Sequence, residues 1–409
     1  MGRFVKILRN FLFLLVFFSI FGGVSISSAQ EITPTDKPVY TVSPTSNAFE
    51  DLTNTDENIN PENPNLQEDV YLIGEVAEVL EEGVNQILDT SYPYQILKIK
   101  IYTDSGTENI QISNEIQPGG DESQRVAKGD RVVITKVVDY QGQVQYFISD
   151  RYRFPSIILL FLVFFLITVA ISKFKGFSSI LGLFFSIIVL ANYVVPGIIN
   201  GQDPFLTCII GALLITPISI YLAHGFNKRT SLALASTLIS IFISAILAVV
   251  FVDIAKLFGT GSEDAYFLKT GLLANINLKG LLLGGIIFGA VGVLDDVTTA
   301  QTAAVDEISK ADKNLGFREL FSKGISVGKE HISSLVNTLV LAYVGSSFPF
   351  LLLFSLNNDV PIWVKYNSEF IVEEVVRTLI GSTTLVLAVP IATFIAAYFM
   401  SKKAKSPIP

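Results

Sequence analysis

The sequence contains a single cysteine, Cys208, which lies inside an apolar run. One cysteine excludes an intramolecular disulfide and a cysteine cluster for a metal ion. A lone thiol in such a run is typical of a small packing residue. Charged residues are also scarce, at 16% of the chain, where soluble globular proteins have about a quarter.

Sequence motifs of membrane-bound enzymes are missing as well. The string nearest to the zinc-binding HExxH motif is KEHISS at 329–334, in which the order is wrong. There is no glycine-lysine P-loop, and Asp295 lacks the GxGD setting of intramembrane aspartyl proteases. Asp295 and Asp296 are adjacent, so on a helix they point about 100° apart and cannot form a carboxylate dyad with each other. We therefore predict no enzymatic activity, no cofactor and no metal site.

The residues that are present divide the chain into two chemical environments. Residues 30–153 are polar, whereas residues 155–400 hold most of the Leu, Ile, Val and Phe. The mean hydropathy of the whole chain is +0.52, and its net charge is −8, which comes largely from the N-terminal segment. Nucleic-acid binding needs a concentrated basic surface, so we predict no nucleic-acid partner.

The N-terminus has the pattern of a secretory signal. Arg3, Lys6 and Arg9 precede an apolar run at 11–21, and the small residues 27–29 come after it. Residues 1–29 are therefore predicted to be a signal peptide, or a signal anchor if they are not cleaved. Residues 30–68 are rich in Pro, Asn, Thr and Asp, which predicts a disordered tether. Either form of signal would carry the tether and the segment after it out of the cytoplasm.

Residues 69–150 are predicted to form a small all-β domain outside the cytoplasm. Alternating or β-rich segments lie at 70–79, 94–102, 108–112, 131–138 and 143–148. Short strands punctuated by Gly, Asp and Pro favour an antiparallel barrel or sandwich. Five strands in about 80 residues would suit an OB-like barrel.

Residues 155–400 are predicted to form a polytopic α-helical membrane domain with about seven transmembrane helices. The apolar segments lie at 155–171, 177–195, 204–221, 231–251, 280–298, 332–356 and 375–400, and most approach the roughly 20 residues that a bilayer requires. With the β domain outside, the C-terminal tail 401–409 lies inside. Lys and Arg are more frequent in the predicted inside loops than in the outside flanks, which favours this orientation.

The fifth segment carries a stripe of glycines: Gly280, Gly284, Gly285, Gly289 and Gly292. Small residues spaced by four let a neighbouring helix backbone approach closely. The stripe predicts either ordinary helix packing or a helix that moves or lines a pore.

Polar residues gather at the predicted inner end of the same segment, namely Asp295, Asp296, Thr298 and Gln301. Ionised groups inside a membrane are costly and usually mark an ion path or a proton relay. We place the two aspartates in the last turns of the helix. The alternative is that the membrane ends at Leu294 and both carboxylates are hydrated.

The sixth segment begins with a second polar set: Glu330, His331, Ser334 and Asn337. Glu330, Ser334 and Asn337 share one helical face, at the same predicted depth as the aspartates. His331 could exchange protons near neutral pH, or it could simply lie at the membrane interface, as is expected for His224. Asn337 must find a hydrogen-bond partner, either a solute or a neighbouring helix.

Several strings together resemble the YibE/F family of bacterial membrane proteins. They are YRFPSIILL at 152–160, GVLDDVTTAQ at 292–301, HISSLVNTLVLAYVG at 331–345 and IGSTTLVLAVP at 380–390. The resemblance covers roughly residues 70–400. It implies a shared architecture and a bacterial cytoplasmic membrane, and it transfers no catalytic residue.

Two functions are hypotheses at this point. The first is a transporter or permease for a small solute or ion, with an inner-side polar site on the fifth and sixth segments. The second is a membrane scaffold or sensor that transports nothing. Its β domain would bind an envelope protein or ligand, and the loop 302–329 would report binding inside the cell.

Overall fold

A computed structural model describes residues 70–87, 90–103, 106–116, 124–138, 142–271, 273–349, 352 and 360–401. The chain divides into two compact units, Met1–Pro155 and Ser156–Pro409. The predicted signal, the predicted tether and all but the first residue of the predicted tail lie outside the described residues.

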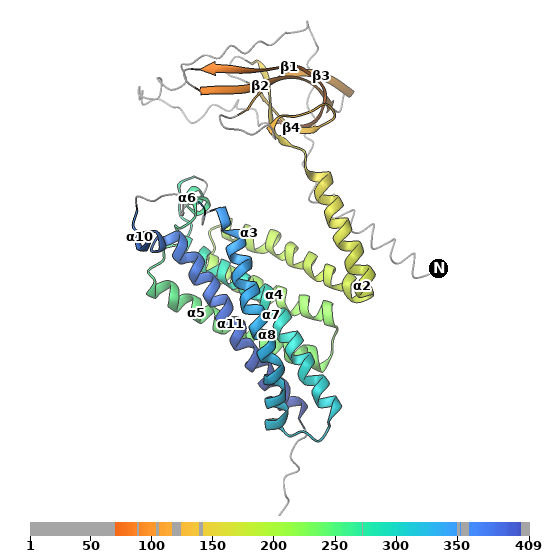
Figure 1. The fold of residues 1–409 in the computed structure, drawn as a ribbon, viewed down its shortest axis with the longest axis vertical. Helices are drawn as coiled ribbons and strands as arrows, with labels where there is room; N and C mark the ends of the chain where they lie inside the picture. Colours follow the sequence, from red (N-terminus) through yellow and green to blue (C-terminus); the bar gives the residue numbers. More distant parts are fainter. Residues whose placement is uncertain are drawn as a thin grey trace, which may run out of the picture. The chain divides into compact units, whose positions relative to one another are not determined.

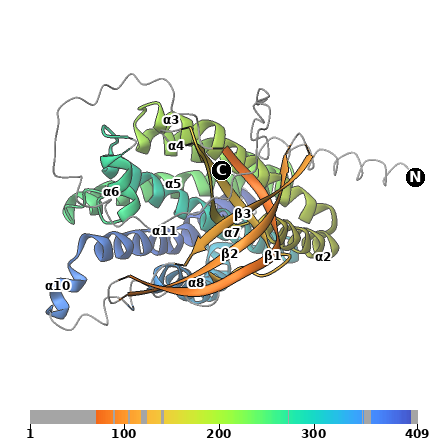
Figure 2. The ribbon, with the colours of Figure 1, turned by 90° about the horizontal axis from the view of Figure 1, so that it is seen from above.

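The first unit contains one antiparallel sheet. Its strands are β1 (Val70–Ile87), β2 (Thr90–Thr103), β3 (Gly106–Glu115), β4 (Arg131–Val138) and β5 (Val144–Arg151), in the order β3-β2-β1-β4-β5. The sheet is strongly twisted (Figure 2), and β3 also contacts β5. The predicted antiparallel β structure is confirmed.

Strand β1 is longer than its sequence pattern predicts because two irregularities interrupt its alternation. Its register against β2 shifts between Val76 and Glu78 and again between Val79 and Glu81. Such bulges bend a strand without ending it. The first part of β1 pairs with β4, and the remainder follows β2 alone.

The core of this unit follows the alternation of β2. Leu97, Ile99 and Ile101 are fully buried, while the residues between them face outward. Gln95 occupies the next inward position, and its amide bonds the backbone of Val126 in both directions: Nε2 donates to the carbonyl at 3.1 Å and Oε1 accepts from the N–H at 2.9 Å. A buried amide is tolerated when it is paired in this way.

The second unit is helical (Figure 1). Its elements are α2 (Phe154–Val189), the π-helix η3 (Leu190–Val194), α3 (Val195–Ile199), α4 (Pro204–His224), α5 (Lys228–Ile254), α6 (Glu263–Thr270), α7 (Leu278–Ala311), α8 (Phe317–Ser346), α10 (Ile362–Tyr366) and α11 (Glu369–Met400).

Five helical segments of the described residues are long and apolar enough to cross a membrane. They are Phe154–Ile199, Pro204–His224, Lys228–Ile254, Leu278–Ala311 and Glu369–Met400. The first is not one continuous helix, because Lys173 has φ 51° and ψ −129° and breaks it. This break falls between the first two predicted spans, and the count of seven crossings stays a prediction.

Two predictions about the segment after Leu294 are wrong. Helix α7 continues to Ala311, so Asp295 and Asp296 lie in its interior rather than in its last turns. The supposed loop 302–329 is mostly helical, because α8 already begins at Phe317. Residues 299–311 contain Ala, Glu and Lys and no Gly or Pro, so the helix continues where the apolar run stops.

The helices pack around α7. Helices α5, α7 and α11 all contact one another, α4 contacts α7 and α5, and α8 contacts α7 and α11. Their shared core includes Ile241 of α5, Leu294 of α7 and Leu385 of α11. Helix α7 thus has neighbours on several sides, and the direction in which each of its polar residues points decides which neighbour it meets.

Candidate functional site

The glycines of α7 do not form one contact surface. A Cβ on Gly284 would clash with Sγ of Cys208 and lie 3.0 Å from its Cβ, and one on Gly280 would lie 3.3 Å from Pro204. These two glycines therefore bring α4 close to α7. Gly289 instead makes room for the Tyr343 hydroxyl of α8, and a Cβ on Gly285 or Gly292 would meet nothing within 4 Å.

The two aspartates of α7 differ in environment. Asp295 is partly buried, and its Oδ1 is inaccessible and has no hydrogen-bond partner among the described residues. Asp296 is exposed and interacts electrostatically with His224 at the end of α4. One turn further on, the Thr299 hydroxyl donates to the backbone carbonyl of Asp295 at 2.7 Å. Asp295 and Thr299 therefore share a face of α7.

A cavity of about 180 Å³ lies where this face of α7 meets the turn between α4 and α5. Its lining comprises His224, Arg229, Thr230, Ala233, Thr299, Ala300 and Ala303. The Thr230 hydroxyl oxygen is buried and has no hydrogen-bond partner among the described residues. The cavity therefore combines small side chains with a cation and hydroxyl groups.

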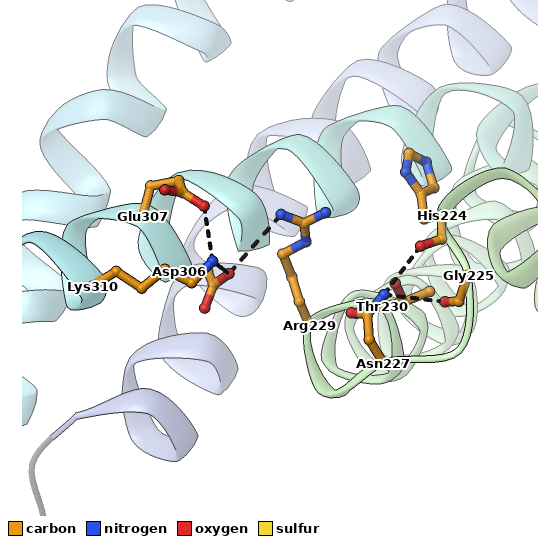
Figure 3. Close-up of polar contacts among 8 residues, drawn as sticks. All are labelled: His224, Gly225, Asn227, Arg229, Thr230, Asp306, Glu307 and Lys310. Atoms are coloured by element: carbon orange, nitrogen blue, oxygen red, sulfur yellow. Dashed lines mark hydrogen bonds and ion pairs between the residues drawn. The ribbon is translucent and has the colours of Figure 1, made fainter. Parts of the chain in front are cut away.

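An ion pair links the α4–α5 turn to α7 (Figure 3). The Asp306 carboxylate of α7 pairs with Arg229 at the start of α5 at 3.9 Å and with Lys310 of its own helix at 2.7 Å. The Asn227 side chain caps α5 by accepting from the Thr230 N–H at 2.9 Å, and its amide donates to the His224 carbonyl at 3.0 Å. Because the Asn227 side chain bonds to residues before and after it, it fixes the backbone of the turn and therefore the position of Arg229.

Thr298 and Gln301 point into the protein interior rather than into this cavity. The Thr298 hydroxyl lies 2.6 Å from that of Thr237 on α5. Gln301 is 0% exposed, and its Nε2 donates to the Gly324 carbonyl at 2.8 Å and to Thr393 Oγ1 at 2.7 Å. Gln301 thus joins α7 to α8 and α11 as a structural link.

The α8 residues of the predicted site lie on a different side of α7. Helix α8 approaches α7 where Gly328 lies against Gln301 and where Tyr343 lies against Gly289. His331 is half-buried, whereas Glu330, Ser334 and Asn337 are exposed. The sharing of one face is as predicted from helical spacing, but the structure does not bring this set to the cavity.

Sequence reasoning missed a row of buried hydroxyl groups on α5. Ser236, Ser240 and Ser244 are 0% exposed and face the neighbouring helices. Their constant spacing of four residues was a readable signal, because that spacing puts side chains on one helical face. Sequence reasoning also missed Arg229 and Asp306, because both were read as ordinary charged residues of loops.

A second missed feature is a pair of glutamates at the start of α11 that binds the segment after α5. Glu369 Oε1 accepts from the Phe258 N–H at 2.7 Å, and its Oε2 accepts from the Thr260 hydroxyl at 2.7 Å. Glu373 is buried and accepts from the Gly261 N–H at 3.0 Å. These bonds fasten residues 258–261 to α11.

Replacing Glu369 with alanine is expected to loosen this fastening. Each lost bond to an ionised acceptor contributes about 1.5–3 kcal/mol, so local opening should become roughly tenfold or more as frequent. The hydrogen-exchange rates of the backbone amides of residues 258–262 measure how often this segment opens. Glu374→Ala is the matched control, because Glu374 pairs with Arg377 of its own helix at 2.6 Å rather than with residues 258–261. Equal exchange in both variants would contradict the assignment.

Helices of this length and apolar composition define a membrane protein. Residues 160–402 match the family described as YibE/F-like protein, and the chain belongs to that family. No curated protein and no solved structure matches the chain. Within the described residues, no three His, Cys, Asp or Glu side chains lie together as metal ligands would.

Proposed function

We propose that this protein is a transporter or permease for a small solute or ion, and that its polar site is the cavity between α4, α5 and α7. The observation that carries the proposal is the buried Oδ1 of Asp295, which has no hydrogen-bond partner among the described residues and lies in a helix apolar enough to cross a membrane. A carboxylate in that setting is costly unless it serves a substrate, an ion or a proton.

The surroundings of Asp295 support this assignment. Thr299 continues the face of Asp295 into the cavity, and Asp296 interacts electrostatically with His224, which also lines the cavity. The close contact at Gly284 brings the backbones of α4 and α7 together, and transporters work by moving one packed group of helices against another. The Asp295 and Asp296 carboxylates act as the groups that couple movement of the solute to movement of an ion or proton.

The proposal includes a membrane orientation. The β domain lies outside a bacterial cytoplasmic membrane, the chain crosses seven times, and the α4–α5 turn lies on the inner side. The Lys and Arg bias of the predicted inside loops supports this arrangement. The β domain is proposed to be OB-like, which the strand order and the contact of β3 with β5 support.

Purified protein in proteoliposomes tests the function. We expect an imposed gradient of protons or monovalent cations to dissipate through wild-type protein, and the flux to fall about tenfold or more in Asp295→Asn. Asp312→Asn is the matched control, because Asp312 is exposed in the turn after α7. If wild type carries no flux, or if Asp295→Asn equals it, transport through this site is wrong.

A membrane scaffold or sensor is the second candidate, and exposed aromatic residues of the sheet favour it. Tyr71 on β1 and Phe147 on β5 are both paired with Thr135, and they are 62% and 47% exposed. Exposed apolar groups in one row are typical of docking surfaces. A photo-crosslinking amino acid at Tyr71 in intact cells should capture an envelope protein, whereas one at the exposed Lys98 should not.

A further inference from the structure

The second half of α8 runs beside the middle of two helices that are apolar enough to cross a membrane. Gly328 lies against Val389 of α11 and Gln301 of α7. Three turns further on, Leu339 lies 3.6 Å from a Cβ placed at Gly381. Tyr343 then reaches Gly289 in the first half of α7. Residues 328–343 therefore share the depth of α7 and α11 wherever these helices lie in the bilayer.

One face of this stretch has no neighbour among the described residues. It consists of Ser334, Asn337, Thr338, Leu341 and Gly345, which we call the α8 face, and all five are exposed. By the spacing of about 100° per residue they span roughly a quarter of the helix surface, opposite the side that packs on α7 and α11. A Cβ on Gly345 would meet no atom of the described residues within 4 Å.

Asn337 is the residue of this face that most requires a partner. The Thr338 hydroxyl is satisfied by its own helix, since it donates to the Ser334 carbonyl at 3.1 Å. The Asn337 amide forms no hydrogen bond within the described part of the chain. An amide has two donors and an acceptor oxygen, and lipid tails can satisfy none of them.

The chemistry of the α8 face is complementary to itself. An amide both donates and accepts, so two copies of Asn337 facing each other across a twofold axis satisfy one another, as the symmetry of a dimer requires. Ser334, Thr338 and Gly345 are small, so two such helices can approach closely enough for the amides to meet. Leu341, on the same line, supplies apolar contact.

We propose that two copies of this chain pair through the α8 face, with the Asn337 amides hydrogen-bonded across the twofold axis. This interface is distinct from the cavity between α4, α5 and α7, because α8 and α4 contact different sides of α7. The pairing does not depend on the proposed transport activity.

Disulfide formation in membranes tests the geometry. The only native cysteine is removed by Cys208→Ala, and Leu341→Cys is then added to the full-length chain. We expect mild oxidation to give a covalent dimer, because residues on the axis face their own copies. The matched control is Phe242→Cys on α5, which is 67% exposed, against 59% for Leu341, but lies on another helix.

The strength of pairing is measured by single-molecule photobleaching in liposomes over a range of protein-to-lipid ratios. Asn337→Leu should weaken the dimer about 3- to 20-fold, the range of measured interhelical hydrogen bonds in membranes. Phe242→Leu should leave it unchanged. The disulfide test keeps Asn337 intact, so it decides the question even if Asn337→Leu does not fold.

Three results would overturn the proposal. The chain could remain monomeric at every density. It could form dimers that Asn337→Leu leaves unchanged and that Leu341→Cys does not cross-link. Finally, Asn337→Leu could reduce solute flux through a monomer, which would assign the α8 face to a solute path instead of a second copy.

Discussion

Replacing Gly284 with leucine is expected to disrupt the helical unit. A side chain there has no space, since its first atom would already clash with Sγ of Cys208 and lie 3.0 Å from the Cys208 Cβ. Helix α4 would have to move away from α7 at this point. Overpacking of this kind costs about 3 kcal/mol or more, and thermal unfolding of the purified protein in detergent should show a clear loss of stability.

Gly292→Leu is the matched control for this prediction. Gly292 lies in the same helix, two turns further on, and a Cβ on it would meet nothing within 4 Å. Because leucine is the better helix former by about 0.8–1 kcal/mol, this variant should be as stable as wild type or slightly more so. If Gly284→Leu and Gly292→Leu unfold alike, the close approach of α4 to α7 at Gly284 is wrong.

Gln301→Ala is expected to have a comparably large effect on stability. The change removes both hydrogen bonds from Nε2, to Gly324 and to Thr393. It also leaves a void at a position that is 0% exposed and lies between three helices. A void in a core together with lost hydrogen bonds should cost about 3–5 kcal/mol, measured as a lower unfolding temperature in detergent.

Gln301→Leu separates the structural role of Gln301 from a transport role. Leucine restores most of the volume, and Thr393 keeps its bond to the Val389 carbonyl at 2.7 Å, so the cost should fall to about 1 kcal/mol. We expect this variant to keep its fold and, if the protein transports, its flux. If the Gln301→Leu protein folds but carries no flux, Gln301 has a role in transport as well as in structure.

The polar residues of α7 illustrate how far the sequence could lead. Hydropathy located Asp295, Asp296, Thr298 and Gln301 in one short segment, but it placed the helix end beside them. The apolar run marks where a membrane could lie, whereas the helix ends where backbone preference changes, at the turn 312–316. The two boundaries differ here because residues 299–311 are polar and still favour a helix.

The same four residues also show what spacing alone leaves undecided. Their angular positions on α7 can be read from the sequence. Gln301 links α7 to α8 and α11 only because of where those two helices pack. Asp296 interacts electrostatically with His224 because of where α4 packs. His224, which had been expected at an interface, lies closer to the candidate site than His331 does.

The sequence by itself determined the division into a β unit and an apolar helical unit, the family and the composition of each helical face. These properties are local, since they depend on hydropathy and on residues a few positions apart. The tertiary structure alone decided which neighbour Gly284 meets. Within the part of the chain that the structure describes, it also decided that Asp295 keeps a buried oxygen without a partner and that the α8 face has no neighbour. Those outcomes depend on contacts between segments far apart in the chain, where packing rather than local preference fixes which face is turned inward.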